Sequence, residues 1–217
     1  PNGGQNALGT NWDAGDIMYE DLNGDGMINN GSNTLDDHGD LVKIGNSTPR
    51  YSFGLDMNAS WKGFDFRAFF QGVLKRDYWN NTYAFWGMQG SVWDATALEP
   101  HLDYFRNDPD HYLGLNIDSY YPRPIVGQGS KNQQTQSRYL INAAYVRLKN
   151  IQLGYTLRPE AVEKIGISNL RIYFSAENIW TLTDVPEMFD PETLDGGVNG
   201  NVYPLSKTYS VGINLSL

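Results

Sequence analysis

The chain has 217 residues and a formal net charge of −9, and 40% of its residues are hydrophobic and 13% aromatic. The acidic balance argues against a nucleic-acid binder, which needs a basic patch to neutralise phosphates. The absence of cysteine rules out a disulfide framework, and no apolar run is long enough for a transmembrane helix. Abundant aromatic residues favour a strand-rich protein with long polar loops.

Residues 1–48 are predicted to form a loop that carries a calcium-like motif. The opening, PNGGQNALGT, has neither the charged start nor the apolar core of a signal peptide, which suggests a piece of a longer chain or a processed one. In the stretch DLNGDGMI, oxygen-bearing side chains recur at Asp21, Asn23 and Asp25, and a glycine follows where an EF-hand turns sharply. Position 12 of that frame is Ser32, where an EF-hand has its closing carboxylate.

Residues 49–75 are predicted to form a hairpin of two strands. Apolar and polar side chains alternate from Tyr51 to Lys62 and again from Phe64 to Lys75, with a tight turn between them. One face of each strand is apolar and the other is polar.

Residues 76–136 are predicted to form a long loop that is rich in aromatic side chains. Exposed aromatic rings bind sugar faces or protein partners. The candidate contacts for a substrate or partner are Trp79, Tyr83, Trp86 and Trp93. The alternative is that these rings form the loop's own small core, since long ordered loops need internal packing.

Residues 137–182 are predicted to hold two further strands. The first runs from Asn142 to Leu157 and needs a bulge near Lys149-Asn150, because its apolar positions change parity there. The second runs from Leu170 to Trp180, and the AVEKIG stretch between them fits a helical turn. Residues 183–206 form another loop, and 207–217 the last strand.

Short turns at one end and long loops at the other are typical of a transmembrane β-barrel. The apolar parity then faces lipid and the polar parity faces the lumen, where Asp56, Arg67 and Glu177 are expected in a network of salt bridges. A soluble β-sandwich shows the same alternation and remains the alternative. Five strands are too few to close a barrel, so the remaining strands are expected elsewhere.

Several spaced motifs resemble the C-terminal region of SusC/RagA-type TonB-dependent outer-membrane transporters. They are, in chain order, GDIMYEDLNGDGMIN, KIGNSTPRYSFGLDMNASWKGFDFRAFFQGV, YVRLKNIQLGYTL, ISNLRIYFSAENIWTLT, DPET and YPLSKTYSVGINLSL. The resemblance extends over most of the chain outside the long loop at about 78–136.

This resemblance implies an all-β chain that supplies the last five antiparallel strands of a 22-stranded barrel with an N-terminal plug. Such a protein lies in the bacterial outer membrane, contacts TonB through an N-terminal part, and imports oligosaccharides or peptides with a SusD-like surface lipoprotein. The rest of the barrel and the plug are not in this chain. The alternative function is a soluble, calcium-dependent carbohydrate-binding β-sandwich.

The resemblance also bears on the calcium-like motif, because the family's loop typically reads DxNxDGxxxxxD and runs into an IGN motif. Counting back from Ile44-Gly45-Asn46 puts Asp40 and Asp37 at loop positions 12 and 9, with an insertion of about eight residues within Asn29–Asp36. The expected structural Ca²⁺ would take its ligands from Asp21, Asn23, Asp25, the Met27 carbonyl, Asp37 and Asp40. The alternative is a turn rich in Asn, Gly and Asp that binds no metal.

No catalytic motif emerges from the sequence, and an enzyme is not expected. Loop carboxylates such as Asp190 and Glu192 are expected to be solvated charges, because nothing fixes a pair of them at a catalytic separation. The histidines are isolated and show no metal-binding spacing.

Overall fold

The computed structural model describes residues 4–87, 96–127, 129–194 and 202–217. The chain folds into two compact units. One unit consists of Pro1–Gly45 and Trp79–Leu140, and the other consists of Asn46–Tyr78 and Ile141–Leu217. The first collects most of the long polar connections, and the second holds the strands.

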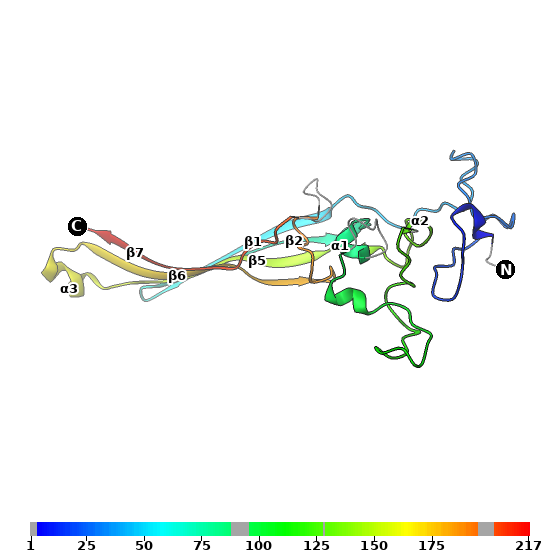
Figure 1. The fold of residues 1–217 in the computed structure, drawn as a ribbon. Coiled ribbons are helices and arrows are strands. Elements are labelled where there is room, and N and C mark those ends of the chain that lie inside the picture. Colours follow the sequence, from blue (N-terminus) through cyan, green and yellow to red (C-terminus); the bar gives the residue numbers. More distant parts are fainter. Residues whose placement is uncertain (1–3, 88–95, 128, 195–201) are drawn as a thin grey trace. The chain divides into compact units, whose positions relative to one another are not determined.

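The strand unit is built on one antiparallel sheet in the order β1-β2-β5-β6-β7, and Figure 1 shows its strands running side by side. The strands are β1 (Arg50–Trp61), β2 (Phe64–Lys75), β5 (Tyr145–Thr156), β6 (Asn169–Thr183) and β7 (Thr208–Ser216). The five strands predicted from alternation are therefore confirmed. The fourth predicted strand is longer than expected and ends at Thr183.

The register places the apolar side chains of all five strands on one face. Cross-strand partners on this face are Leu55 and Phe70, Phe66 and Leu153, Leu153 and Phe174, and Phe174 and Val211. Partners that lie directly opposite each other point to the same side of a sheet, so these pairs form a continuous apolar surface. Its large side chains are exposed, including Leu153, Phe174 and Val211.

The predicted bulge in the third strand is confirmed. The pairing of β5 with β6 shifts register between Leu148 and Asn150, and β2 shifts opposite the same point. Lys149 is the extra residue, so Leu148 and Ile151 both stay on the apolar face although their parities differ. On β6 the irregularity coincides with Asn178, whose φ of 54° is left-handed.

The short connections lie at one end of the sheet and the long ones at the other. Lys62 and Gly63 join β1 to β2 with φ values of 48° and 89°, as a two-residue turn with both central residues left-handed requires. The link between β5 and β6 contains the helix α3 (Pro159–Val162) and the 3-10 helix η4 (Glu163–Ile165), which confirms the predicted helical turn. At the opposite end, marked by the pairs of Arg50 with Lys75 and Tyr145 with Thr183, the chain enters β1, runs from β2 to β5 and runs from β6 to β7.

A second, two-stranded sheet changes the predicted start of the third strand. Residues Ile141–Asn142 form β4, which pairs with β3 (Asp77–Tyr78) rather than with the main sheet. Next to this pair the Ala143 N–H donates to the Arg76 carbonyl at 2.8 Å. The Asp77 carboxylate in turn accepts the Asn46 N–H of the IGN motif at 2.9 Å.

The polar face of the main sheet carries ion pairs. Arg67 bonds Asp56 at 2.7 Å, as expected for a polar wall. Arg171 reaches Asp65 across β5 at Gly154, where a side chain would collide with both partners. Glu177 is exposed and makes no ion pair with the described residues.

The other unit has little regular structure. The helices among its described residues are η1 (Gln5–Ala7), α1 (Tyr83–Trp86), η3 (Glu99–Leu102) and α2 (Gly129–Asn132). Phe85, Trp86, Tyr121 and Tyr139 form its aromatic core. No helix in the described parts of the chain combines the length and hydropathy needed to cross a membrane.

The turn at Gly63 provides a test of the hairpin. A Cβ at Gly63 would lie 2.8 Å from the Thr156 carbonyl oxygen, in addition to the strain of a left-handed backbone. We expect Gly63→Ala to lower the free energy of unfolding by more than the ~1–2 kcal/mol of that strain alone. The matched control is Gly166→Ala, which has φ 77° but open space around its Cβ. Equal losses in denaturant titrations of the two variants would contradict the close approach.

Candidate functional site

The calcium-like motif folds into a loop held by its own side chains. The Asp21 carboxylate accepts the N–H groups of Gly24 and Gly26 at 2.7 and 2.8 Å. Asn23 accepts the Asp25 N–H at 3.0 Å, and Asp25 accepts the Met27 N–H at 2.8 Å. These are Asx-type bonds, which fix the backbone with or without a metal.

Asp40 closes this loop, in the position that the IGN motif implies. Its two carboxylate oxygens accept the N–H groups of Leu22 and Asn29 at 2.8 and 2.7 Å, and its own N–H donates to the Asn29 carbonyl at 2.8 Å. The Asn29 bond is the main cause that lowers the pKa of Asp40. Residues 30–39 therefore lie between Asn29 and Asp40, which are hydrogen-bonded to each other. This is the arrangement expected for an insertion in the loop.

Asp37 bonds residues of the stretch 30–39 and none of the loop ligands, so the insertion extends past Asp36 and Asp37 is not at the expected loop position 9. Its carboxylate accepts the Ser32 N–H at 2.9 Å and the Ser32 hydroxyl at 2.5 Å, and this hydroxyl bond is the main cause that lowers its pKa. The Met27 carbonyl already accepts the Asn29 side-chain amide at 3.3 Å. Among the described residues no three acidic or imidazole side chains converge as a metal site, so a cation here would depend on amide and carbonyl oxygens as well.

The predicted aromatic contacts occupy three different environments. Trp86 is only 2% exposed and its indole N–H donates to the Asn80 carbonyl at 2.9 Å, which leaves almost no ring surface for a substrate or partner. Trp79 is half-buried and packs 5.8 Å from the Trp86 ring. Tyr83 is 48% exposed and is the accessible member. Trp93 lies outside the described residues.

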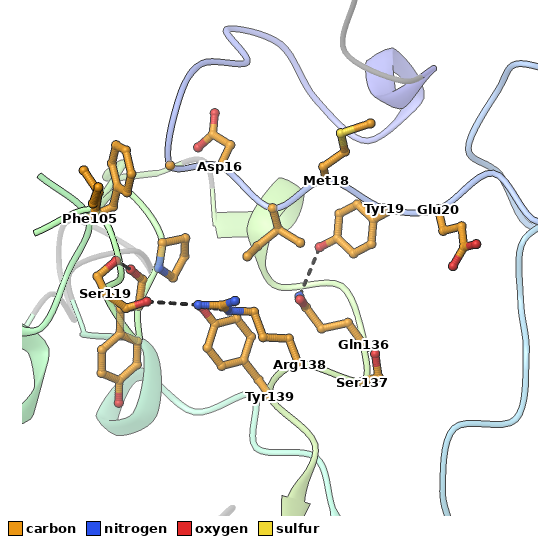
Figure 2. Close-up of a pocket in the computed structure, with 15 residues that line it drawn as sticks. Asp16, Met18, Tyr19, Glu20, Phe105, Ser119, Gln136, Ser137, Arg138 and Tyr139 are labelled. Atoms are coloured by element: carbon orange, nitrogen blue, oxygen red, sulfur yellow. Dashed lines mark hydrogen bonds between the residues drawn. The ribbon is translucent and has the colours of Figure 1, made fainter. Parts of the chain in front are cut away.

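A pocket of about 470 Å³ lies in the same unit, and sequence reasoning missed it. Three segments line it: residues 15–20, residues 105–122 and residues 136–139. Figure 2 shows Tyr19 pointing toward Gln136, which donates to the Tyr19 hydroxyl at 3.2 Å, while Arg138 donates to the Ser119 carbonyl at 2.9 Å. The volume suits a small ligand or one unit of a chain-like ligand.

The phenols around this pocket are neutral hydrogen-bonding groups. Burial raises the pKa of Tyr19, Tyr121 and Tyr139 above the ordinary value for tyrosine. The Tyr139 hydroxyl donates to the Tyr120 carbonyl at 2.6 Å. The pocket therefore offers aromatic walls and uncharged hydroxyls, with the Arg138 guanidinium at one side.

A buried cation holds the first of the three lining segments in place. Lys131 is 1% exposed, and its ammonium donates to the Asp16 carboxylate at 2.8 Å and to the Asn11 carbonyl at 3.0 Å, over the Trp12 ring. Arg123 also bonds the Asp16 carboxylate, at 2.7 Å. A lysine in a polar loop gives no sequence signal for this role, because its partners are more than 100 positions away.

The Asp16 cluster leads to a prediction on stability. Burial works to raise the pKa of Asp16, but the bonds from Arg123, Lys131 and Asn132 outweigh it and bring the pKa to about 2. The charged Asp16 carboxylate therefore contributes its full stabilisation of the fold above the ordinary carboxyl pKa of 3.8. This contribution is lost as the pH falls toward 2 and Asp16 becomes protonated.

At neutral pH, Asp16→Asn leaves Lys131 buried without its counter-charge, which should cost ~3–5 kcal/mol of local stability. Hydrogen exchange of the Ile17 amide, which donates to Asn132, reports this loss. The control Asp13→Asn removes the charge of a side chain that is 74% exposed and 3.8 Å from Arg123, and should change little. Similar exchange rates in the two variants would refute the role of the cluster.

Comparison with known proteins finds similarity to TonB-dependent receptors. No family model matches it. It is 27% identical over 214 residues to TonB-dependent receptor P3 of Formosa agariphila, which covers 94% of this chain and 19% of that protein. TonB-dependent receptor P26 of the same organism is 26% identical over 212 residues, covering 93% of this chain and 20% of the relative.

Solved structures agree with the sequence relatives. The RagAB peptide transporter matches 78% of this chain and 17% of that chain, with a TM-score of 0.59 and 30% identity. The RagAB peptide importer in its closed-closed state matches 84% of this chain and 18% of that chain, with a TM-score of 0.60 and 29% identity. The chain thus spans about a fifth of the length of the relatives it matches. The resemblance to SusC/RagA-type TonB-dependent receptors that the motifs indicate is confirmed over nearly the whole chain.

Proposed function

We propose that this chain is part of the wall of an outer-membrane, TonB-dependent importer of nutrients. The observation that carries the proposal is the main sheet, which presents one continuous, exposed apolar face and an opposite face with ion pairs. Such a face needs an apolar environment, because leaving it in water forfeits ~25 cal/mol for each Å² of apolar surface. In a membrane barrel this environment is lipid.

Strand length and connection length support the membrane over a sandwich. The strands hold 9–15 residues, and a tilted strand needs about 9–11 to cross a bilayer. The described residues contain no second sheet that would cover the apolar face, since β3 and β4 have two residues each. The alternative, a soluble calcium-dependent carbohydrate-binding sandwich, lacks this second layer in the described part of the chain.

Within the proposal, the long connections face the cell exterior and meet the substrate and a SusD-like surface lipoprotein. The substrate is an oligosaccharide or a peptide, and the RagAB relatives, described as peptide transporters, favour a peptide. The exposed Tyr83 and the pocket lined by Tyr19 and Arg138 are the contacts this chain would supply. Contact with TonB belongs to a part of the transporter outside this chain.

We also propose that Ca²⁺ strengthens the loop that Asp40 closes. The support is the donor set of Asp21, Asn23, Asp25 and Asp40, whose hard oxygens suit this ion. Backbone N–H groups already hold these carboxylates in place, and the ion would add rigidity to an exterior loop. Asp37 lies in the insertion and is the weakest of the expected ligands.

The two faces of the sheet can be compared at neighbouring residues of β6. Phe174→Arg places a charge on the apolar face near the middle of the strand, and should destabilise the inserted transporter by ~2–4 kcal/mol. Ser175→Arg places the same charge on the polar face and should cost much less. The measurement is urea unfolding of the full-length protein in lipid vesicles. A soluble protein in which Ser175→Arg is the more harmful change would refute the membrane proposal.

The calcium proposal has a matched pair of variants. Addition of Ca²⁺ to the full-length protein should slow proteolysis within residues 21–40, and Asp40→Asn should abolish this protection. Asp37→Asn keeps the loop ligands and should retain most of it. Protection that is absent in the unmodified protein, or lost equally in both variants, would contradict the proposed site.

A further inference from the structure

The pocket in the unit of long connections holds a cation without a counter-charge. Arg138 lines this pocket and forms no ion pair with the residues that the structure describes, in a chain whose net charge is −9. The Asp16 carboxylate at the pocket wall is already bound by Lys131 and Arg123. Figure 2 shows the Glu20 carboxylate pointing away from Arg138. The guanidinium is therefore available to an anion that enters the pocket.

Two main-chain carbonyls and one hydroxyl hold this guanidinium in a fixed orientation. Arg138 Nη2 donates to the carbonyls of Ser119 and Tyr120 at 2.9 and 3.5 Å. Its Nε donates to the Tyr139 hydroxyl at 3.3 Å. Nη1 carries two further N–H groups and makes no hydrogen bond with the described residues. A carboxylate binds arginine through such N–H groups in a charge-assisted pair, and a side chain that is already ordered loses little rotamer entropy on binding.

The rest of the pocket is preformed and partly apolar. Its apolar lining consists mainly of Ile17, Phe105, Ile117 and Pro122. Phe105 packs directly over Gly15, where a Cβ would collide with the ring. The Gly15 carbonyl also accepts the Arg123 N–H at 2.8 Å, which joins the first lining segment to the end of the second. A preformed pocket of this kind accepts an apolar group beside the guanidinium.

The composition of the wall favours a peptide over a sugar. Tyr121 and Tyr139 line the pocket with only 5% and 1% of their surface exposed, so they offer almost no flat ring face on which a sugar could stack. A peptide that ends in the pocket brings a carboxylate and an apolar side chain on the same residue. An internal aspartate or glutamate brings the carboxylate alone and leaves the apolar lining unused. The free Nη1 group and the apolar lining together therefore fit a C-terminal residue best.

We propose that this pocket binds the C-terminal residue of a substrate peptide, with its carboxylate on Arg138 and its apolar side chain against Ile17, Phe105 and Pro122. The inference rests on the proposed function, within which a peptide is the favoured substrate. It adds which end of the peptide the pocket recognises. Every peptide released by hydrolysis of a protein carries a C-terminal carboxylate, so the site suits an importer of digestion products.

The test compares two forms of one peptide. A fluorescent dye is attached to the N-terminus of Ser-Gly-Ser-Gly-Leu, which is made with a free C-terminal carboxylate and as the C-terminal amide. Binding to the full-length transporter in detergent is followed by fluorescence anisotropy. The free acid should bind about tenfold more tightly than the amide, because the amide lacks the charged partner of Arg138. Equal affinity of the two forms, or no binding of either form, would overturn the inference.

Variants of Arg138 test whether the preference arises in this pocket. Arg138→Gln should weaken binding of the acid to the level of the amide and leave binding of the amide unchanged. Arg138→Lys keeps the charge but loses the planar fork, and should retain part of the preference. The matched control is Lys43→Gln, which removes one exposed charge of the same unit outside the pocket lining and should leave the preference as it is. If Lys43→Gln reduces the preference as much as Arg138→Gln, the acid responds to net charge alone and the inference is wrong.

Two further probes examine other sources of a carboxylate. One is an amidated form of the peptide with a single internal glutamate. If it binds as tightly as the free acid and depends on Arg138, the pocket accepts any peptide carboxylate and the C-terminal assignment fails. The other probe is an oligogalacturonate. If Arg138→Gln weakens its binding and not that of the peptide acid, the pocket belongs to an acidic glycan and the inference is overturned.

These outcomes are separate from the outcome for the membrane proposal. If the full-length protein inserts into lipid vesicles and binds the acid and the amide equally, only the assignment of the pocket fails. If the protein does not insert, the proposed function fails, whichever form of the peptide the pocket prefers.

Discussion

The strand unit depends on one geometric constraint, which is that neighbouring residues of a strand point to opposite faces. A slip of one residue in any pairing would exchange the apolar and polar faces of that strand. The five strands avoid this because their registers agree, so that Phe66, Leu153, Phe174 and Val211 form one row across the sheet. The bulge at Lys149 adds one unpaired residue to β5. As a result Leu148 and Ile151, which differ in parity, both lie on the apolar face.

The unit of long connections meets a different constraint, because few of its described apolar side chains are buried and it has little regular structure. It gains order from a small aromatic core around Phe85 and Trp86 and from polar side chains that satisfy backbone groups. Lys131 illustrates the second device, since one ammonium binds two carbonyls and the Asp16 carboxylate. Buried polar groups of this kind are stable only when every partner is present.

The difference between the alternating strands and the irregular long connections explains what could be predicted from the sequence. Alternation is a local signal, so the strands, the turn at Lys62-Gly63 and the bulge near Asn150 were all accessible to it. The sequence shows that residues 76–136 are rich in aromatic side chains. It does not show that Trp86 is buried while Tyr83 is exposed. The pocket and the Asp16 cluster were inaccessible, because each joins residues distant in sequence through side-chain bonds with no periodicity.

The carboxylates of the DPET stretch are a second case in which the sequence does not predict the partners of a side chain. Asp190 and Glu192 have no local feature that distinguishes them from solvated loop charges, and their partners are on β5. The structure shows that burial works to raise the pKa of Asp190, and that the bonds from Arg147 and from backbone N–H groups outweigh it and lower the pKa. The connection between β6 and β7 is thereby bound to β5.

The closure of the calcium-like loop by Asp40 has a practical consequence. Asp40 bonds Leu22 and Asn29, so the two ends of residues 30–39 are held together by hydrogen bonds that involve none of the residues between them. The stretch is exposed at nearly every position. It is a suitable place to insert an epitope tag or a fluorophore, because the bonds of Asp40 that close the loop lie outside it.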